Sequence, residues 1–152
     1  MIKNRKFVIL LLASFILNGF IFAQIDDQPS GNFVSRNQDE QVQSILSDIQ
    51  NDLNKANVSS LSKYFGSQTY LSLENGVNGY YSSNQAYYVL ESFFKNYQVI
   101  SFKLNNIKND SDNPCATGVY DYDLNGKRDS VQVYLSLKKI GDSWKITQIS
   151  ID

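Results

Sequence analysis

The segment of this 152-residue chain that most resembles a site for chemistry is an acidic stretch, Asp121 to Asp129 (DYDLNGKRD). It matches the start of a calcium-binding loop, in which oxygen-bearing residues alternate before a glycine and a ninth-position residue adds another ligand. The twelfth position, however, is Gln132 rather than the acid that binds calcium with two oxygens. A tight hairpin turn at Asn125-Gly126 explains the same residues. We expect the hairpin and no metal site.

Histidine is absent from the sequence, and Cys115 is the single cysteine. This excludes Ser-His-Asp triads, Cys-His pairs and zinc sites with histidine ligands. It also excludes a disulfide within the chain. Catalysis would have to use a carboxylate, Tyr, Lys or Cys115, and a thiol without a histidine partner is a poor nucleophile. We therefore expect no catalytic residue and no cofactor.

Aromatic residues are the remaining candidates, since the chain has ten tyrosines and nine phenylalanines. Their positions predict either core packing or the wall of a pocket with phenol groups at its wet mouth. Two acids, Glu74 and Glu91, lie close to them in sequence, but neither occupies a clear inward position. We expect a small apolar or aromatic ligand, if one binds, to contact Tyr70, Tyr88, Phe94, Tyr120 and Tyr122.

The N-terminus has the pattern of an export signal. Basic residues at positions 3 to 6 precede an apolar run from Phe7 to Leu17, and Ala23-Gln24 offers a cleavage site. The run is shorter than the roughly 20 apolar residues of a membrane span. We expect a signal peptide at 1–23 and a periplasmic or secreted product without a membrane span after cleavage. Residues 24–37 are polar and predict a flexible leader.

The composition of the rest predicts one folded domain at 38–152. The chain is 42% hydrophobic and has a net charge of −1, which becomes more negative when the basic signal is removed. Without a cluster of Lys and Arg, nucleic acid is excluded as the main ligand.

The first part of the domain predicts helices and a short hairpin. Apolar residues three and four apart indicate a helix over 38–56, followed by a short helix over 57–65 capped by Ser59 or Ser60. Asn75-Gly76 predicts a hairpin between 69–74 and 77–81. Ser82 or Ser83 then caps a helix whose inner face comprises Ala86, Leu90, Phe93, Phe94 and Tyr97.

The remainder alternates between apolar and polar residues, which predicts strands over 99–107, 116–124, 127–140 and 143–152. In the first of these, Ile100, Phe102 and Leu104 are expected to face inward. The turn at Asn125-Gly126 sets Tyr120 opposite Val131 and Tyr122 opposite Asp129. A change of alternation between Ile146 and Ile149 predicts a bulge. The order of elements indicates a curved sheet with helices on one face.

Several of these segments together resemble a known family. They are YYSSNQA at 80–86, the Phe93-Phe94 pair, Ser101-Phe102-Lys103 and the closing residues 135–152. They resemble the DUF4783 family of small exported Bacteroidota proteins, which looks like a member of the NTF2-like (cystatin-like, cone-shaped α+β) superfamily. The resemblance covers about 39–152. It implies an NTF2-like cone, with three N-terminal helices packed on a curved antiparallel sheet of about four strands plus a short hairpin.

The resemblance implies a fold but no activity, because NTF2-like domains include enzymes, small-ligand binders and interaction modules. We expect a non-catalytic module that binds a small ligand in its cone or another protein through its open sheet face. NTF2-like sheets often dimerise, so a homodimer is also expected. The alternative is an isomerase or cyclase-type enzyme that uses Tyr and a carboxylate in the cone. A buried carboxylate facing a Tyr would favour the enzyme, whereas an interior filled by Phe, Leu and Tyr would favour binding or structure.

Overall fold

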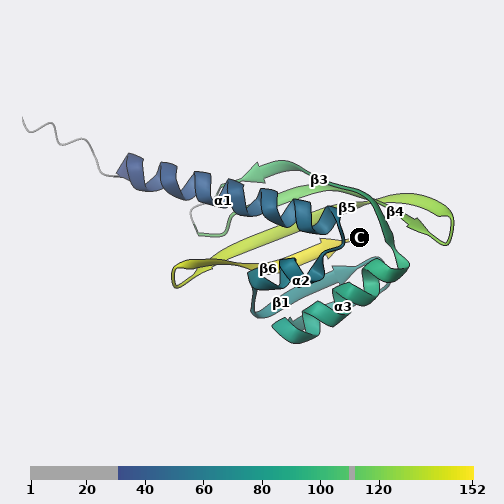
Figure 1. Cartoon of the computed structure of the whole chain (residues 1–152). Helices are drawn as coiled ribbons and strands as arrows, with labels where there is room; N and C mark the ends of the chain where they lie inside the picture. Colours follow the sequence, from purple (N-terminus) through teal and green to yellow (C-terminus); the bar gives the residue numbers. More distant parts are fainter. Residues whose placement is uncertain (1–30, 110–111) are drawn as a thin grey trace, which may run out of the picture.

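The computed structural model describes residues 31–109 and 112–152. The expected signal peptide and residues 24–30 of the expected leader lie outside this part of the chain. The helices are α1 (Gly31–Asn54), α2 (Val58–Leu61) and α3 (Ser83–Asn96), and a 3-10 turn η1 (Ser62–Tyr64) follows α2. The strands are β1 (Phe65–Leu73), β2 (Asn78–Ser82), β3 (Gln98–Lys108), β4 (Cys115–Leu124), β5 (Lys127–Ile140) and β6 (Ser143–Ile151) (Figure 1).

Helix α1 carries the predicted apolar stripe on its inner side, where Val42, Leu46, Ile49 and Leu53 are all buried. It begins at Gly31, so residues 31–37 of the expected leader are helical, and adding turns to an existing helix costs little. The short helix that follows is capped by Asn57, not by Ser59 or Ser60, because the Asn57 side chain accepts a hydrogen bond from the Ser60 amide at 3.1 Å.

Helix α3 begins at Ser83 and is capped by Ser82, one of the two caps that the sequence predicted. The Ser82 hydroxyl accepts from the Gln85 amide, and the Gln85 side chain accepts in return from the Ser82 amide at 3.0 Å. This capping box fixes where the helix starts and therefore which side faces the sheet. Four of the five residues predicted for the inner face are buried, Ala86, Leu90, Phe93 and Phe94, whereas Tyr97 is half-buried and forms the C-cap.

All six strands belong to one sheet, in the order β2-β1-β6-β5-β4-β3. The prediction of about four strands plus a short hairpin is wrong, because the β1–β2 hairpin joins the main sheet through β1. It is wrong also in calling the sheet antiparallel, since β1 pairs parallel with β6. Alternation of apolar residues shows that a segment is a strand, but it does not show which strand becomes its neighbour.

Pairing across the Asn125-Gly126 turn follows the prediction, with Tyr120 opposite Val131 and Tyr122 opposite Asp129. The predicted bulge in β6 is also present, because Ser136 and Leu137 of β5 pair with Gln148 and Ile146, leaving Thr147 extra. The prediction for Ile100 is wrong. A register shift in β3 between Val99 and Ser101 leaves Ile100 unpaired and 47% exposed.

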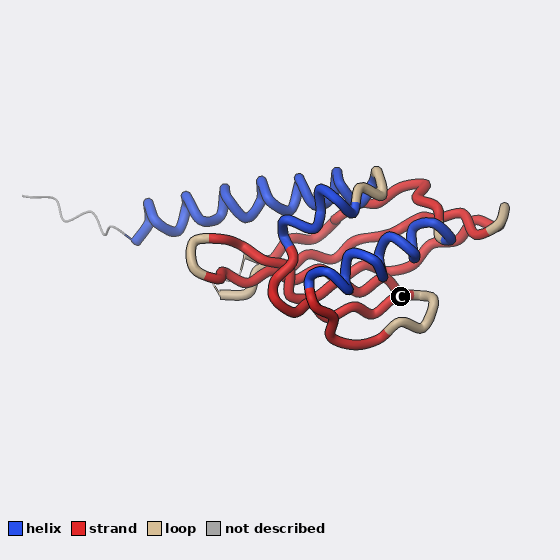
Figure 2. The backbone as a smooth tube through the Cα atoms, turned by 60° about the horizontal axis from the view of Figure 1, so that its bottom comes forward, coloured by secondary structure: helices blue, strands red, loops and turns tan. Residues whose placement is uncertain are grey.

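The helices lie on one face of the curved sheet, with α1 along β3 and α3 over β1 and β2 (Figures 1 and 2). Helix α1 also covers the outer edge of β3. The Asn54 amide donates to the Phe102 carbonyl and accepts from its N–H, both at 2.7 Å, and Gln50 accepts from the Leu104 N–H. None of the described helices is long and apolar enough to cross a membrane.

Candidate functional site

The space between the helices and the sheet is occupied by an aromatic cluster. Phe93 stacks on Tyr97 with ring centroids 4.6 Å apart, and Phe94 meets the Tyr120 ring edge-on at 6.0 Å. Tyr120 in turn stacks on Tyr122 at 5.6 Å. These rings are contributed by α3, its C-terminal end and β4. The cluster occupies the interior between α3 and β4.

Tyr120 lies at the centre of this cluster and is fully buried. Its hydroxyl donates a hydrogen bond to the backbone carbonyl of Tyr97. Burial raises the pKa of the Tyr120 phenol far above its usual range, with a smaller contribution from Tyr122. The phenol therefore stays neutral at physiological pH, and its one proton is already used to hold the end of α3 against β4.

The five predicted site residues do not form one site. Phe94, Tyr120 and Tyr122 are together in the core, each at most 5% exposed. Tyr70 lies on the opposite face of the sheet, where its hydroxyl donates to the Asn78 side chain at 2.7 Å. Tyr88 is 60% exposed on the outer side of α3. A pocket that uses all five residues is therefore ruled out by their placement.

The acids that an isomerase-type site would need are also outside the aromatic cluster. Glu74 is exposed after β1, and Glu91 forms an ion pair with Lys95 at 3.2 Å on the surface of α3. A tyrosine and a carboxylate do meet elsewhere, because the Tyr64 hydroxyl donates to exposed Asp48 at 2.9 Å. Burial, followed by this hydrogen bond and the charges of Asp48 and nearby Asp52, raises the pKa of Tyr64 to about 12.

The face of the sheet opposite the helices is uncovered in the part of the chain that the structure describes (Figure 2). Its side chains are those that alternate with the buried ones, and most are half-buried against one another. We call the middle of this surface the central patch. It contains no charged residue and comprises Tyr70, Ser72, Cys115, Thr117, Val119, Gln132, Tyr134, Ser136, Gln148 and Ser150.

Charged residues border the central patch. Asp152 lies at one side, where it accepts a hydrogen bond from Ser72, and Lys103 and Asp121 lie at the other. Sequence analysis expected an open sheet face, and the outward positions of β4, β5 and β6 follow from the same alternation that located the core. An uncharged centre with a charged border is the arrangement found in protein–protein interfaces.

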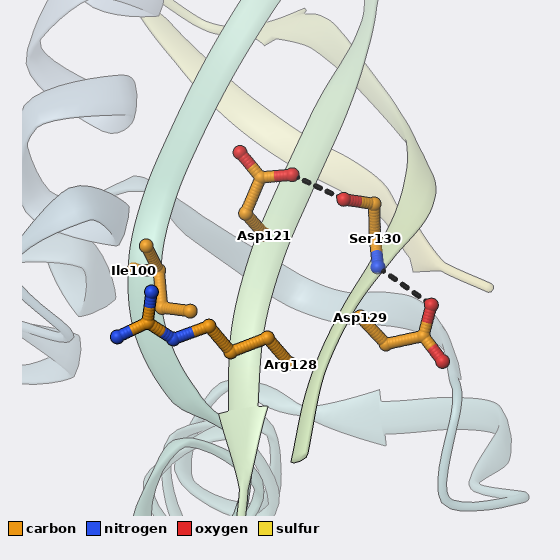
Figure 3. Close-up of a pocket in the computed structure, with 5 residues that line it drawn as sticks. All are labelled: Ile100, Asp121, Arg128, Asp129 and Ser130. Atoms are coloured by element: carbon orange, nitrogen blue, oxygen red, sulfur yellow. Dashed lines mark hydrogen bonds between the residues drawn. The ribbon is translucent and has the colours of Figure 1, made fainter. Parts of the chain in front are cut away.

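A shallow pocket of about 440 Å³ lies at the border of this face, between β3, β4 and β5 (Figure 3). Its acidic wall is Asp121, which accepts hydrogen bonds from the Ser101 hydroxyl at 2.6 Å and from the Ser130 hydroxyl. These bonds, Ser101 first, hold the pKa of Asp121 below its usual value. Ile100 and the Arg128 side chain form the other wall.

The predicted hairpin at Asn125-Gly126 is confirmed, because both residues have the positive φ angles of a tight turn, 56° and 87°. The acids of the calcium-like pattern are engaged locally. Asp123 accepts from the Gly126 amide at 2.6 Å, and Asp129 accepts from the Ser130 amide at 2.9 Å. No group of three or more acidic or sulfur ligands that could hold a metal ion occurs within residues 31–109 and 112–152.

The sequence of residues 46–152 matches the family model "Domain of unknown function (DUF4783)". The chain belongs to the DUF4783 family. A DUF4783 family protein from Bacteroides uniformis has a similar crystal structure, with 22% identity and a TM-score of 0.63 over 70% of this chain and 94% of that chain. No curated protein matches the sequence.

Similar structures also occur outside DUF4783. An NTF-2-like protein of unknown function from Shewanella oneidensis is 16% identical, with a TM-score of 0.52 over 74% of this chain and 96% of that chain. A ketosteroid isomerase-like protein from Erwinia carotovora is 11% identical, with a TM-score of 0.60 over 72% of this chain and 90% of that chain. These likenesses confirm the α+β NTF2-like fold of this DUF4783 protein, and at such identities they concern the fold alone.

Proposed function

We propose that this DUF4783 protein is a non-catalytic interaction module of the periplasm that pairs with a second copy of itself through the central patch. The proposal rests on two features together: aromatic side chains fill the interior, and the central patch on the open sheet face is uncharged. An NTF2-like domain that acts on or stores a small molecule needs an empty cone. Here the cone is occupied by the protein's own aromatic side chains.

The chemistry of the central patch favours an identical partner. Its hydroxyl and amide groups each donate and accept hydrogen bonds, so two copies of the same surface can satisfy one another across a two-fold axis. A surface with a net charge would repel its own copy. Tyr134 and Val119 add apolar area at the middle of the patch, and tyrosine is enriched in interfaces. Burial raises the pKa of Tyr134, with Cys115 contributing, so the phenol adds no charge.

The isomerase or cyclase alternative is not favoured by the described residues. It requires a carboxylate facing a tyrosine among the rings of the interior, and Glu74 and Glu91 lie outside the cluster. The buried acid, Asp52, is 7% exposed but lies on α1 near Tyr64, away from the rings of α3 and β4. Two tyrosine–carboxylate hydrogen bonds occur at the described helices, Tyr64 to Asp48 and Tyr87 to Glu91, and both lie outside the aromatic cluster. The phenol with the strongest burial, Tyr120, is committed to the Tyr97 carbonyl.

The periplasmic location rests on the sequence of residues 1–23, which has the basic, apolar and small-residue segments of an export signal. The absence of a cysteine after the apolar run fits release rather than a lipid anchor. N-terminal sequencing of the protein from a periplasmic extract should begin at Gln24. Retention of Met1 in a membrane fraction would contradict this part of the proposal.

Analytical ultracentrifugation tests the dimer directly. We expect the wild-type chain to sediment as a dimer at micromolar concentration. The double variant Thr117→Lys/Gln132→Lys should be a monomer, because both side chains are exposed in the central patch and two copies would bring four cations together. The loss of affinity should be at least about 100-fold, the effect of roughly 3 kcal/mol.

A matched control adds the same charge to the helical side of the molecule. Asn51→Lys/Ser92→Lys changes two exposed residues of α1 and α3, and it should leave the dimer intact. A wild-type chain that stays monomeric up to roughly 0.1 mM would refute self-association, since a weaker pair has little free energy of binding. Native mass spectrometry of the same sample would reveal a retained small molecule, which would favour the ligand-binding alternative.

A further inference from the structure

A second pocket, on the helical side of the sheet, carries an inference that is independent of the proposed dimer. It has a volume of about 210 Å³ and lies where α1, η1 and the start of β6 meet. Helix α1 contributes Gln41 and Ile45, and η1 contributes Lys63 and Tyr64. The remaining lining residues are Asp142, Ser143, Trp144 and Lys145. We call it the Trp144 pocket.

Trp144 gives this pocket an unusual property. Its side chain is only 3% exposed, and its indole N–H is buried without a hydrogen-bond acceptor among the described residues. A buried donor without a partner costs free energy, and most native structures avoid it. When such a donor belongs to a residue that lines a pocket, a bound acceptor is the simplest way to satisfy it.

The neighbouring side chains define the charge of that acceptor. The Lys145 ammonium is held by a hydrogen bond to the Lys63 carbonyl at 2.7 Å, and the Lys63 ammonium lies 4.7 Å from the centre of the Tyr64 ring. Both lysines line the pocket; Asp142 is the acid among its lining residues, and Asp48 lies beside it on the Tyr64 hydroxyl. Two ammonium groups and an indole N–H are donors only, so together they suit an anion.

The size and walls of the pocket define the rest of the ligand. A volume of about 210 Å³ corresponds to roughly seven water molecules at about 30 Å³ each. Ile45 and the rings of Tyr64 and Trp144 provide apolar walls. An inorganic anion would leave these walls uncovered, whereas a carboxylate on a short aliphatic chain would cover them and also reach the donors.

We propose that the Trp144 pocket binds a small aliphatic carboxylate, whose oxygen accepts the indole N–H of Trp144 and whose charge is balanced by Lys63 and Lys145. The carboxylate comes either from a free short-chain acid or from an acidic side chain of a peptide. Both sources present the same group to the same three donors, and the assay below separates them.

Trp144 is the only tryptophan in the chain, so its indole N–H gives one peak in a proton–nitrogen NMR spectrum. We expect butyrate to move this peak downfield in a saturable way. Butyramide, which has the same shape without the charge, should need at least about tenfold more ligand for the same shift. The peptide source is tested by comparing N-acetylglutamate amide with its uncharged analogue N-acetylglutamine amide. Whichever acid binds more tightly, butyrate or N-acetylglutamate amide, identifies the source of the carboxylate.

Three variants test the named contacts. Lys145→Met and Lys63→Met should each weaken butyrate binding about tenfold, the effect of losing one charge-assisted contact. Using both variants keeps the test valid if one of them disturbs η1. Trp144→Phe replaces the indole by a phenyl ring without an N–H, and it should abolish the butyrate-dependent shifts of the backbone amides of residues 142–145.

Lys139→Met is the matched control. Lys139 is exposed and pairs with Trp144 across β5 and β6, but it does not line the pocket, so binding should be unchanged. The proposal is overturned if the indole peak does not saturate by about 50 mM butyrate, since binding weaker than this has little specificity. Equal responses to butyrate and butyramide, or equal losses in Lys139→Met and Lys145→Met, would also overturn it.

Discussion

Truncation of Phe94 tests whether the interior of the cone is filled. Phe94 is 5% exposed, and its ring meets Phe93 at 5.4 Å and Tyr120 at 6.0 Å. Phe94→Ala removes these contacts and opens a cavity that the neighbouring rings, held by α3 and β4, cannot collapse to fill. We expect the free energy of unfolding to fall by about 3 to 5 kcal/mol.

This loss translates into a large change in melting temperature. For a domain of about 120 residues, the entropy of unfolding near 60 °C is about 0.25 kcal/mol/K, so Tm should fall by roughly 12 to 20 °C. Circular dichroism during heating and urea denaturation would measure the two quantities. The denaturant slope should stay the same, because the surface exposed on unfolding hardly changes.

Tyr88→Ala is the matched control for this measurement. It truncates an aromatic residue of the same helix that is 60% exposed and contacts Tyr87 edge-on at 5.1 Å. Its cost should stay within about 1 kcal/mol. If Phe94→Ala melted like Tyr88→Ala, the cluster would not be a packed core. The argument that the cone has no room for a ligand would then fail.

Three further changes test other contacts. Gly118→Ala should destabilise the fold by more than about 3 kcal/mol in urea denaturation, because the added Cβ would lie 2.0 Å from a backbone oxygen of β3. Asn54→Ala should cost about 1 to 3 kcal/mol in the same assay, since it leaves the Phe102 N–H and carbonyl without their partner. NMR titration should find the pKa of Asp121 below its ordinary value, and Ser130→Ala should raise it. The contribution of Asp121 to stability is complete above about pH 4, the ordinary pKa of the unfolded chain. It is lost as the pH falls through the lower pKa of the folded state.

Controls for these changes are available in the same elements or nearby. Gly66→Ala places a Cβ no closer than 3.4 Å to its neighbours, so it should be tolerated. Asn51→Ala removes an exposed amide of α1 and should have little effect. Ser92→Ala, on α3, should leave the pKa of Asp121 unchanged. Equal effects of a change and its control would show that the assigned contact does not contribute.

Local sequence signals predicted the parts of the fold that depend on local geometry. Asn125-Gly126 tolerates positive φ at both turn positions, and this alone set the register that places Tyr120 opposite Val131. Ser82, one of the two predicted caps, is the N-cap of α3. The alternation change between Ile146 and Ile149 located a bulge, because a bulge shifts every later side chain to the other face.

Features that depend on distant contacts could not be predicted in this way. The parallel pairing of β1 with β6 joins Leu71 to Ile149, and nothing near either residue specifies the other. The exposure of Ile100 comes from a shift against β4 rather than from its own sequence. Tyr88 is different, because helical periodicity places it away from Ala86 and Leu90, and the pattern could have excluded it from the predicted site.

The position of β6 has a consequence for how the chain folds. Although β6 is the last of the six strands in sequence, it lies inside the sheet, with β1 on one side and β5 on the other. Its contacts with β1 close a loop of most of the domain, for example between Leu73 and Ile151. Pairings so distant in sequence form slowly, because the entropy of loop closure must be overcome first. Until β6 arrives, the β1–β2 hairpin has no attachment to β5, so the chain should remain incompletely folded until its final strand is available.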